Sequence, residues 1–340
     1  MGTNNVLAAV RRVVADPRMS WAHDPQLWVE LFVTMNLAIL AADIYIAHSV
    51  NHFQKWPEYI PLYFSICAPV LLAIVIALRW IWNLLAPWRD IGYLLGWLSI
   101  LIGLGGVLYH LESRFFLDRT LKSLTYAAPF AAPLAYTGLG FLLLVNRMVE
   151  VRTSEWARWV ILLALGGFFG NFVLSLSDHA ANGFFAHTEW IPVISSALAT
   201  GFLLVPLVMP VTRRYLDLCM VVMLAQGAVG VLGFWFHMQA NLIEPGASLW
   251  DKLVNGAPPM APLLFPNLVG LAWHTPGLKR SGNGLPPASL AAARRSSLLY
   301  PQRAETGPHL QDECAASNLL RMHAARCGMR RVSRKPILEP

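Results

Sequence analysis

Eight apolar stretches constrain this chain more than any other feature. They cover roughly residues 27–48, 60–85, 91–110, 123–146, 157–178, 190–211, 215–238 and 258–274. Each meets or approaches the about 20 apolar residues that a helix needs to cross the bilayer, where lipid offers no partners for backbone N–H and C=O groups. We therefore predict an all-α polytopic membrane protein with eight transmembrane helices, embedded in the lipid bilayer. Pro259, Pro262 and Pro266 interrupt the last stretch, so it either spans the membrane or re-enters it.

The charged residues indicate the orientation of these helices. They make up only 13% of the chain, whereas soluble proteins carry about 25%. Lys and Arg concentrate in the flanks on the N-terminal side of the membrane, which favours cytoplasmic N- and C-termini in a plasma (inner) membrane. Residues 1–26 then form a cytoplasmic segment, and residues 277–340 form a basic, disordered cytoplasmic tail. This distribution explains the net positive charge, so no nucleic-acid partner is expected.

Two sequence patterns recur in the same order along the chain. "HSVNHFQKWPEYIP" at residues 48–61 matches "HAANGFFAHTEWIP" at residues 179–192, and "APFAAPL" at residues 128–134 matches "APPMAPL" at residues 257–263. Nearly equal offsets for two separate patterns indicate a duplication. We predict two tandem four-helix repeats, called here the first half (27–147) and the second half (148–276). An even number of helices in each would relate them by a pseudo-two-fold axis along the membrane normal.

This arrangement gathers the polar residues of both patterns at the extracytoplasmic face. The conspicuous ones are four histidines near the ends of apolar helices, two asparagines and three carboxylates: His48, His110, His179, His237, Asn51, Asn182, Glu58, Glu189 and Asp178. The prolines and aromatic residues of the patterns suit a first helical turn and the membrane interface. Polar and small residues form stripes along the helices that precede the histidines, among them Gly103, Gly106, Gly230 and Gly233. We expect these stripes to face the protein interior.

Imidazole is the commonest protein metal ligand and a usual axial ligand of haem. The four histidines, with Asp178, predict a site for zinc, copper or iron. Alternatively, pairs of histidines on facing helices predict a haem b site, with Arg114, Arg119 and Lys122 near its propionates. Asp178, Glu58 and Glu189 are the candidate catalytic carboxylates. Because Asp178 directly precedes His179, we expect the second half to hold the working site if only one half does.

Eight spans in two four-helix halves, with one histidine per hairpin, are similar to the plan of haem A synthases and of some quinone-binding membrane subunits. The E-x-x-H-type signature of those proteins is absent here, so the resemblance concerns the fold. It implies two parallel halves with histidine sites between their helices.

Three functions remain open from the sequence. The first is redox or hydrolytic chemistry at a metal or haem. The second is transport through a polar site between the repeats, suggested by Asn171, Ser175 and Gln226 within predicted helices. The third is a structural or accessory subunit that binds a partner subunit at its extracytoplasmic face. No phosphate-binding loop, nucleophile elbow or dinucleotide fingerprint identifies a substrate.

Overall fold

The computed structural model describes residues 24–151, 153–243 and 248–273. The described part is helical and contains no strand. Its longer helices are α2 (Pro25–Ser49), α3 (Tyr59–Trp82), α4 (Leu85–Glu112), α7 (Leu134–Met148), α8 (Ser154–Ala181), α9 (Trp190–Val208), α10 (Arg213–Ile243) and α12 (Leu264–Trp273). Short helices are α5 (Phe115–Asp118), α6 (Leu121–Thr125) and α11 (Leu249–Asn255). Single 3₁₀ turns are η2 (Trp56–Glu58), η3 (His187–Glu189) and η4 (Ala261–Leu263). The predicted segment 1–26, except for its last residues, and the predicted tail 277–340 lie outside the described residues.

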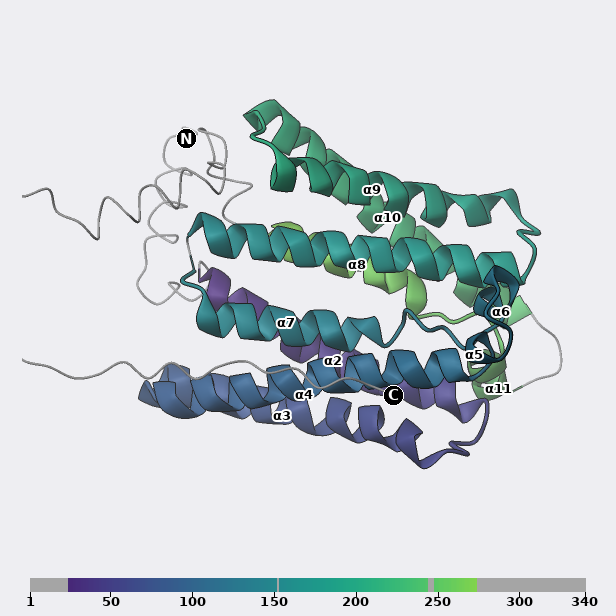
Figure 1. The fold of residues 1–340 in the computed structure, drawn as a ribbon, viewed down its shortest axis with the longest axis horizontal. Coiled ribbons are helices and arrows are strands. Elements are labelled where there is room, and N and C mark those ends of the chain that lie inside the picture. Colours follow the sequence, from purple (N-terminus) through teal and green to yellow (C-terminus); the bar gives the residue numbers. More distant parts are fainter. Residues whose placement is uncertain (1–23, 152, 244–247, 274–340) are drawn as a thin grey trace, which may run out of the picture. The chain divides into compact units, whose positions relative to one another are not determined.

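Six helices in the described ranges are long and apolar enough to cross a membrane: α2, α3, α4, α8, α9 and α10. Only 22–33% of each apolar window is buried within the protein, so most of their apolar surface is available to lipid. The all-helical, membrane-embedded class of protein predicted from the sequence is therefore supported. The long helices run along a common direction, and α5, α6 and α11 lie at one end of them (Figure 1).

The fourth and eighth predicted spans are shorter than expected. α7 begins at Leu134 rather than near residue 123, and α12 begins at Leu264 after a 3₁₀ turn. Prolines explain both late starts, because Pro129 and Pro133 precede α7, and Pro258 and Pro262 precede α12. Proline lacks the N–H that a helix interior requires and is tolerated only around the first turn. At 15 and 10 residues, these helices do not reach the length of a regular span.

The helix starts follow ordinary capping chemistry. The Asp24 side chain accepts a hydrogen bond from Gln26 N at the start of α2, and Thr153 caps α8 in the same way. Such caps satisfy backbone N–H groups that have no partner inside the helix. Asn83, with φ 54°, ends α3 in the left-handed conformation and reverses the chain into α4.

The core lies where α2, α3, α7, α8, α9 and α12 meet, and contains Leu37, Leu72, Leu143, Phe168 and Leu203. α4 packs along α7, α9 along α8, and α10 along α12, while α7 and α12 both contact α8. α2 and α12 are also joined by a hydrogen bond from Asn36 Nδ2 to Asn267 Oδ1, at 3.1 Å. Finally, α6 contacts α8 and α11 contacts α2. The short helices thus pack on long helices distant in sequence.

Candidate functional site

His48 and Glu58 meet where α2 ends and η2 begins. His48 Nδ1 lies 3.6 Å from Glu58 Oε2, and Asn51 Nδ2 donates to Glu58 Oε1 at 3.0 Å. Glu58 Oε2 is buried and has no hydrogen-bond partner within the described residues. The imidazole nitrogen is the ionisable group paired with this oxygen. The three polar residues singled out in the first pattern form one cluster.

His110, in the last turn of α4, faces the proline-rich loop before α7. Its Nδ1 lies 3.0 Å from the carbonyl oxygen of Pro129. Three residues later, Ser113 Oγ accepts a hydrogen bond from Ala128 N at 3.0 Å, which fixes the loop on the helix end. The rings of His110 and His48 lie near each other, with centroids 6.2 Å apart and planes at 69°. The two sequence patterns of the first half therefore meet at a pair of histidines.

The second half repeats the two contacts made by the histidine Nδ1 atoms. His179 Nδ1 lies 3.5 Å from Glu189 Oε2, and His237 Nδ1 lies 2.8 Å from the carbonyl oxygen of Pro258. Glu189 Oε2 is again buried without a hydrogen-bond partner in the described residues. His179 and His237 are close enough to interact electrostatically. Each half thus brings one histidine supported by a carboxylate near one supported by a backbone carbonyl.

The turn after each carboxylate-supported histidine has an unusual backbone. Phe53 N donates to His48 O at 3.2 Å, and Phe184 N donates to His179 O at 3.0 Å. Both phenylalanines are left-handed, with φ 52° and 50°, a region that side chains rarely adopt. Stacking compensates, because Phe53 packs on Tyr59 at 4.9 Å and Phe184 on Trp190 at 4.0 Å between centroids. The aromatic residues of the patterns therefore build the turn that positions the histidine.

The predicted stripes of small residues face the protein, as expected. A Cβ atom on Gly103 would lie 2.9 Å from Pro133 O, and one on Gly106 would lie 2.7 Å from Pro133 Cβ. On α10, a Cβ on Gly230 would lie 2.6 Å from Pro262 O, and one on Gly233 would lie 2.9 Å from Pro262 Cβ. The glycines allow each proline-rich loop to approach the helix that carries His110 or His237. They serve the site by close packing.

Asp178 and Asn182 do not join the cluster. Asp178 is exposed on α8, and within the described ranges no hydrogen bond or ion pair connects it to a histidine. Glu189 takes the supporting role predicted for Asp178, because η3 folds back onto the end of α8. Asn182 is also exposed, and no hydrogen bond joins it to Glu189 in this part of the chain. Asp178 is therefore no reason to place a working site in the second half rather than in the first.

The predicted metal site shared by four histidines is not found. Among the described residues, no group of three or more His, Cys, Asp or Glu side chains is arranged to hold a metal ion. The contacts instead connect His48 with His110, and His179 with His237. The buried amides that suggested transport, Asn171 Nδ2 and Gln226 Oε1, have no hydrogen-bond partner within the described residues.

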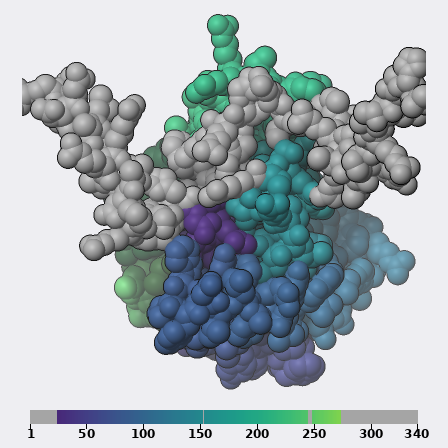
Figure 2. All heavy atoms as spheres, turned by 90° about the vertical axis from the view of Figure 1, so that its left-hand side faces the viewer, coloured from purple at the N-terminus to yellow at the C-terminus, as the bar shows by residue number. Residues whose placement is uncertain are grey.

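A buried charge cluster at the opposite end of the helices was not predicted. Arg147 at the end of α7 forms a two-pronged ion pair with Glu30 of α2, and Asn146 Nδ2 donates to Glu30 Oε1 at 2.7 Å. The guanidinium groups of Arg147 and Arg79 lie 3.8 and 4.0 Å from the Trp88 ring centroid. Figure 2 shows the start of α2, in purple, next to blue atoms of the first half at this end. The sequence did hold one indication of this cluster, because Glu30 is a carboxylate inside an apolar span.

No family model, curated protein or solved structure matches this chain.

Proposed function

We propose that this chain is a membrane electron-transfer protein in which each half holds one b-type haem between two histidines. His48 and His110 would hold the haem of the first half, and His179 and His237 would hold that of the second. The two halves are parallel four-helix repeats, and both haems lie toward the extracytoplasmic face. The observation that carries the proposal is the histidine pair with both Nδ1 atoms directed to acceptors, present once in each half.

The tautomers favour ligation. A carbonyl oxygen only accepts, so Nδ1 of His110 and of His237 carries the proton in each bond to proline. Their Nε2 atoms then hold the free lone pair of a neutral imidazole. The same holds for His48 and His179 when Nδ1 points its proton at the carboxylate. Metal-binding histidines almost always donate the other ring N–H to a carboxylate or a carbonyl in this way.

The separation of the pair fits two ligands on opposite sides of one iron. Metal–imidazole bonds are about 2.0 Å, and each ring centroid lies about 1.2 Å behind its nitrogen, so opposed ligands place their centroids about 6.4 Å apart. The centroids of His48 and His110 are 6.2 Å apart. This agreement supports a shared iron in the first half, and the same supporting contacts extend the proposal to the second.

Haem accounts for a site with only two protein ligands. A bare zinc or copper ion usually takes three or four protein ligands, and the described residues offer no such group. In haem the macrocycle supplies the remaining bonds, and the protein supplies the axial ligands. Arg114, Arg119 and Lys122 follow His110 within twelve residues and are the proposed partners of the propionates. A haem held by two histidines would supply electron transfer rather than a binding position for substrate.

The test is a visible spectrum and a haem assay on the full chain purified from membranes of cells supplied with haem. We expect two haems per chain and a reducible b-type spectrum. His48→Ala and His110→Ala should each remove the same haem, and His179→Ala and His237→Ala the other. His187→Ala is the matched control, because His187 is exposed at the start of η3. A colourless protein, or one with stoichiometric copper or zinc and no haem, would overturn the proposal.

A further inference from the structure

A groove of about 390 Å³ lies between α2 and α3, near the end of the helices where α2 begins. Its walls include Leu27 and Leu31 from α2, and Ala73, Ala77 and Trp80 from α3. The two alanines lie one helical turn apart, and their small side chains leave space between the helices. Because both helices are long and apolar enough to cross a membrane, we expect the groove to face lipid.

Polar side-chain atoms of the groove wall belong to two residues. Thr34 lines the groove, but its hydroxyl already donates to the carbonyl oxygen of Glu30 at 2.8 Å. Trp80 is less than half exposed, and its indole ring suits the membrane interface, where one edge is apolar and the other polar. An occupant of the groove therefore meets apolar atoms along its length and a polar group beside Trp80.

A positively charged side chain lies at this polar end of the groove. Arg79 precedes Trp80, and its Nη2 donates to Oε1 of Gln26, the residue before Leu27, at 2.8 Å. This hydrogen bond joins α3 to α2 directly beside the groove walls. The guanidinium carbon also lies 4.0 Å from the ring centroid of Trp88, a cation–π contact that holds the side chain in place.

Arg79 forms no ion pair within the described residues. Arg147 lies against the same Trp88 ring and binds both carboxylate oxygens of Glu30. Asp24 is close enough to act on Arg79 electrostatically, but its side chain caps α2. Two guanidinium groups thus share one buried carboxylate, which Arg147 occupies. The charge distribution favours an additional anion at Arg79, and a guanidinium matches the geometry of a phosphate.

The second half lacks both the groove and the cation at the matching positions. At the offset of the first sequence pattern, Leu204 and Val208 replace the two alanines, and Pro210 replaces the arginine. The larger side chains would fill the space between the helices, and proline carries no charge. Small groove residues and the cation are therefore present together in one half and absent together from the other, as expected if they bind one ligand.

We propose that this groove binds one anionic phospholipid. One acyl chain lies between α2 and α3, and the phosphate accepts hydrogen bonds from Arg79, with Trp80 beside the headgroup. Anionic headgroups are favoured because a zwitterionic headgroup would bring a second cation close to Arg79 and Arg147. The site needs no haem and lies apart from the histidine pairs, so it does not rest on the proposed function.

The test adds dioleoyl phosphatidylglycerol to the full-length protein, purified in a neutral detergent, and follows the thermal midpoint. We expect a saturable rise of the midpoint, because a ligand that binds the folded state alone stabilises it. Dioleoyl phosphatidylcholine has the same acyl chains and no net charge. It should bind about tenfold more weakly.

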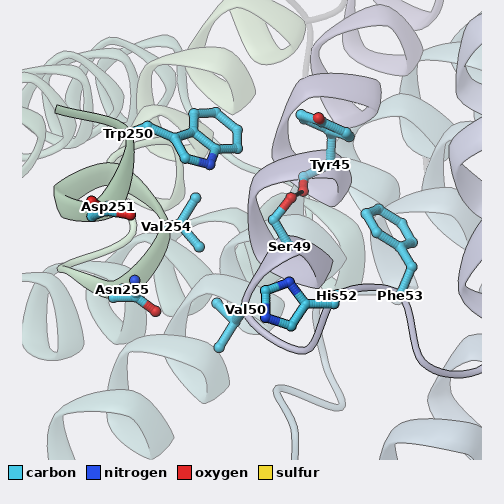
Figure 3. Close-up of a pocket in the computed structure, with 9 residues that line it drawn as sticks. All are labelled: Tyr45, Ser49, Val50, His52, Phe53, Trp250, Asp251, Val254 and Asn255. Carbon is cyan, nitrogen blue, oxygen red and sulfur yellow. Dashed lines mark hydrogen bonds between the residues drawn. The ribbon is translucent and has the colours of Figure 1, made fainter. Parts of the chain in front are cut away.

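Two variants remove the two parts of the site separately. Arg79→Gln removes the cation, and Ala73→Leu fills the groove with the side chain found in the second half. Each should weaken binding of phosphatidylglycerol about tenfold. Arg89→Gln is the matched control for charge, because Arg89 is exposed and pairs with Asp90. Trp250→Leu is the control for a lining side chain, because Trp250 borders a cavity at the other end of α2 (Figure 3).

Native mass spectrometry counts the retained lipid directly and remains informative if a variant is less stable. We expect one phosphatidylglycerol on the unaltered chain and none on Arg79→Gln. Four outcomes overturn the proposal: no saturable effect of phosphatidylglycerol, equal affinity for phosphatidylcholine, an equal effect of inorganic phosphate, or binding that survives both variants. His48→Ala should lose one haem and keep the lipid, so this proposal and the proposed function fail separately.

Discussion

The Nδ1 atom of His110 lies 3.0 Å from the carbonyl oxygen of Pro129. The same carbonyl accepts a hydrogen bond from Ala132 N at 3.1 Å, and its second lone pair is available to the imidazole. The bond fixes both the ring orientation and the tautomer of His110. His237 and Pro258 form the same bond at 2.8 Å. The proline-rich loops therefore have a direct role in presenting imidazole, beyond starting the helices that follow.

Asn241 holds the second of these loops in place. Its carboxamide accepts from Ala257 N at 2.7 Å and donates to Ala257 O at 2.8 Å, and the residue is buried. We expect Asn241→Leu to destabilise the protein by about 1–3 kcal/mol, because two backbone groups lose their partners. Thermal unfolding in detergent measures this loss. Gln239→Leu, at an exposed position on the same helix, is the control, and equal melting of the two variants would contradict the prediction.

Close packing of α4 on the first loop gives a second prediction. A Cβ at Gly103 would lie 2.9 Å from Pro133 O, whereas one at Gly105 would meet nothing within 4 Å. Gly103→Ala should therefore cost about 1–3 kcal/mol through overpacking, and Gly105→Ala should be neutral or stabilising because alanine favours helix. Both are read from thermal midpoints of the purified variants. A Gly103→Ala protein as stable as Gly105→Ala would show that the loop does not pack so closely.

The sequence predicts the contents of the candidate site better than its geometry. Matching patterns singled out the histidines and both glutamates, and these residues do meet. Neighbours in a helix point in different directions, so Asp178 is exposed while His179 contacts Glu189. Only tertiary structure could replace it with Glu189, which comes from a turn that folds back on α8.

The lengths of the apolar stretches also overestimated the lengths of two helices, α7 and α12. Residues 126–133 extend the apolar stretch of the fourth predicted span, yet Pro129 and Pro133 keep them in a loop that supports His110. Hydropathy measures burial and not helicity, so loops packed against helices count as span. The partner of Glu30 was equally hidden, because Arg147 lies 117 residues away at the end of another helix.

The Glu30–Arg147 pair supports a third prediction. Both side chains are fully buried, so removing one leaves the other charge without compensation. Glu30→Ala should destabilise the protein by about 3–5 kcal/mol, while Glu30→Leu combined with Arg147→Met should recover most of that loss. The exposed pair Arg89–Asp90 provides the control, since Asp90→Ala should change stability by about 0–1 kcal/mol. Thermal unfolding of the three variants tests this, and a double variant worse than Glu30→Ala would refute it.

The carboxylates next to His48 and His179 lead to the last prediction. A carboxylate at Nδ1 makes imidazole a more basic ligand, which favours the ferric over the ferrous state. Glu58→Gln should thus raise the midpoint potential of the first proposed haem by about 60 mV, the shift for a tenfold change in relative affinity in a one-electron couple. The second haem should stay unchanged, and Glu189→Gln should give the reverse pattern. Redox titration of the visible spectrum separates the two. Potentials that move together, or downward, would show that Glu58 and Glu189 do not act on separate histidine pairs.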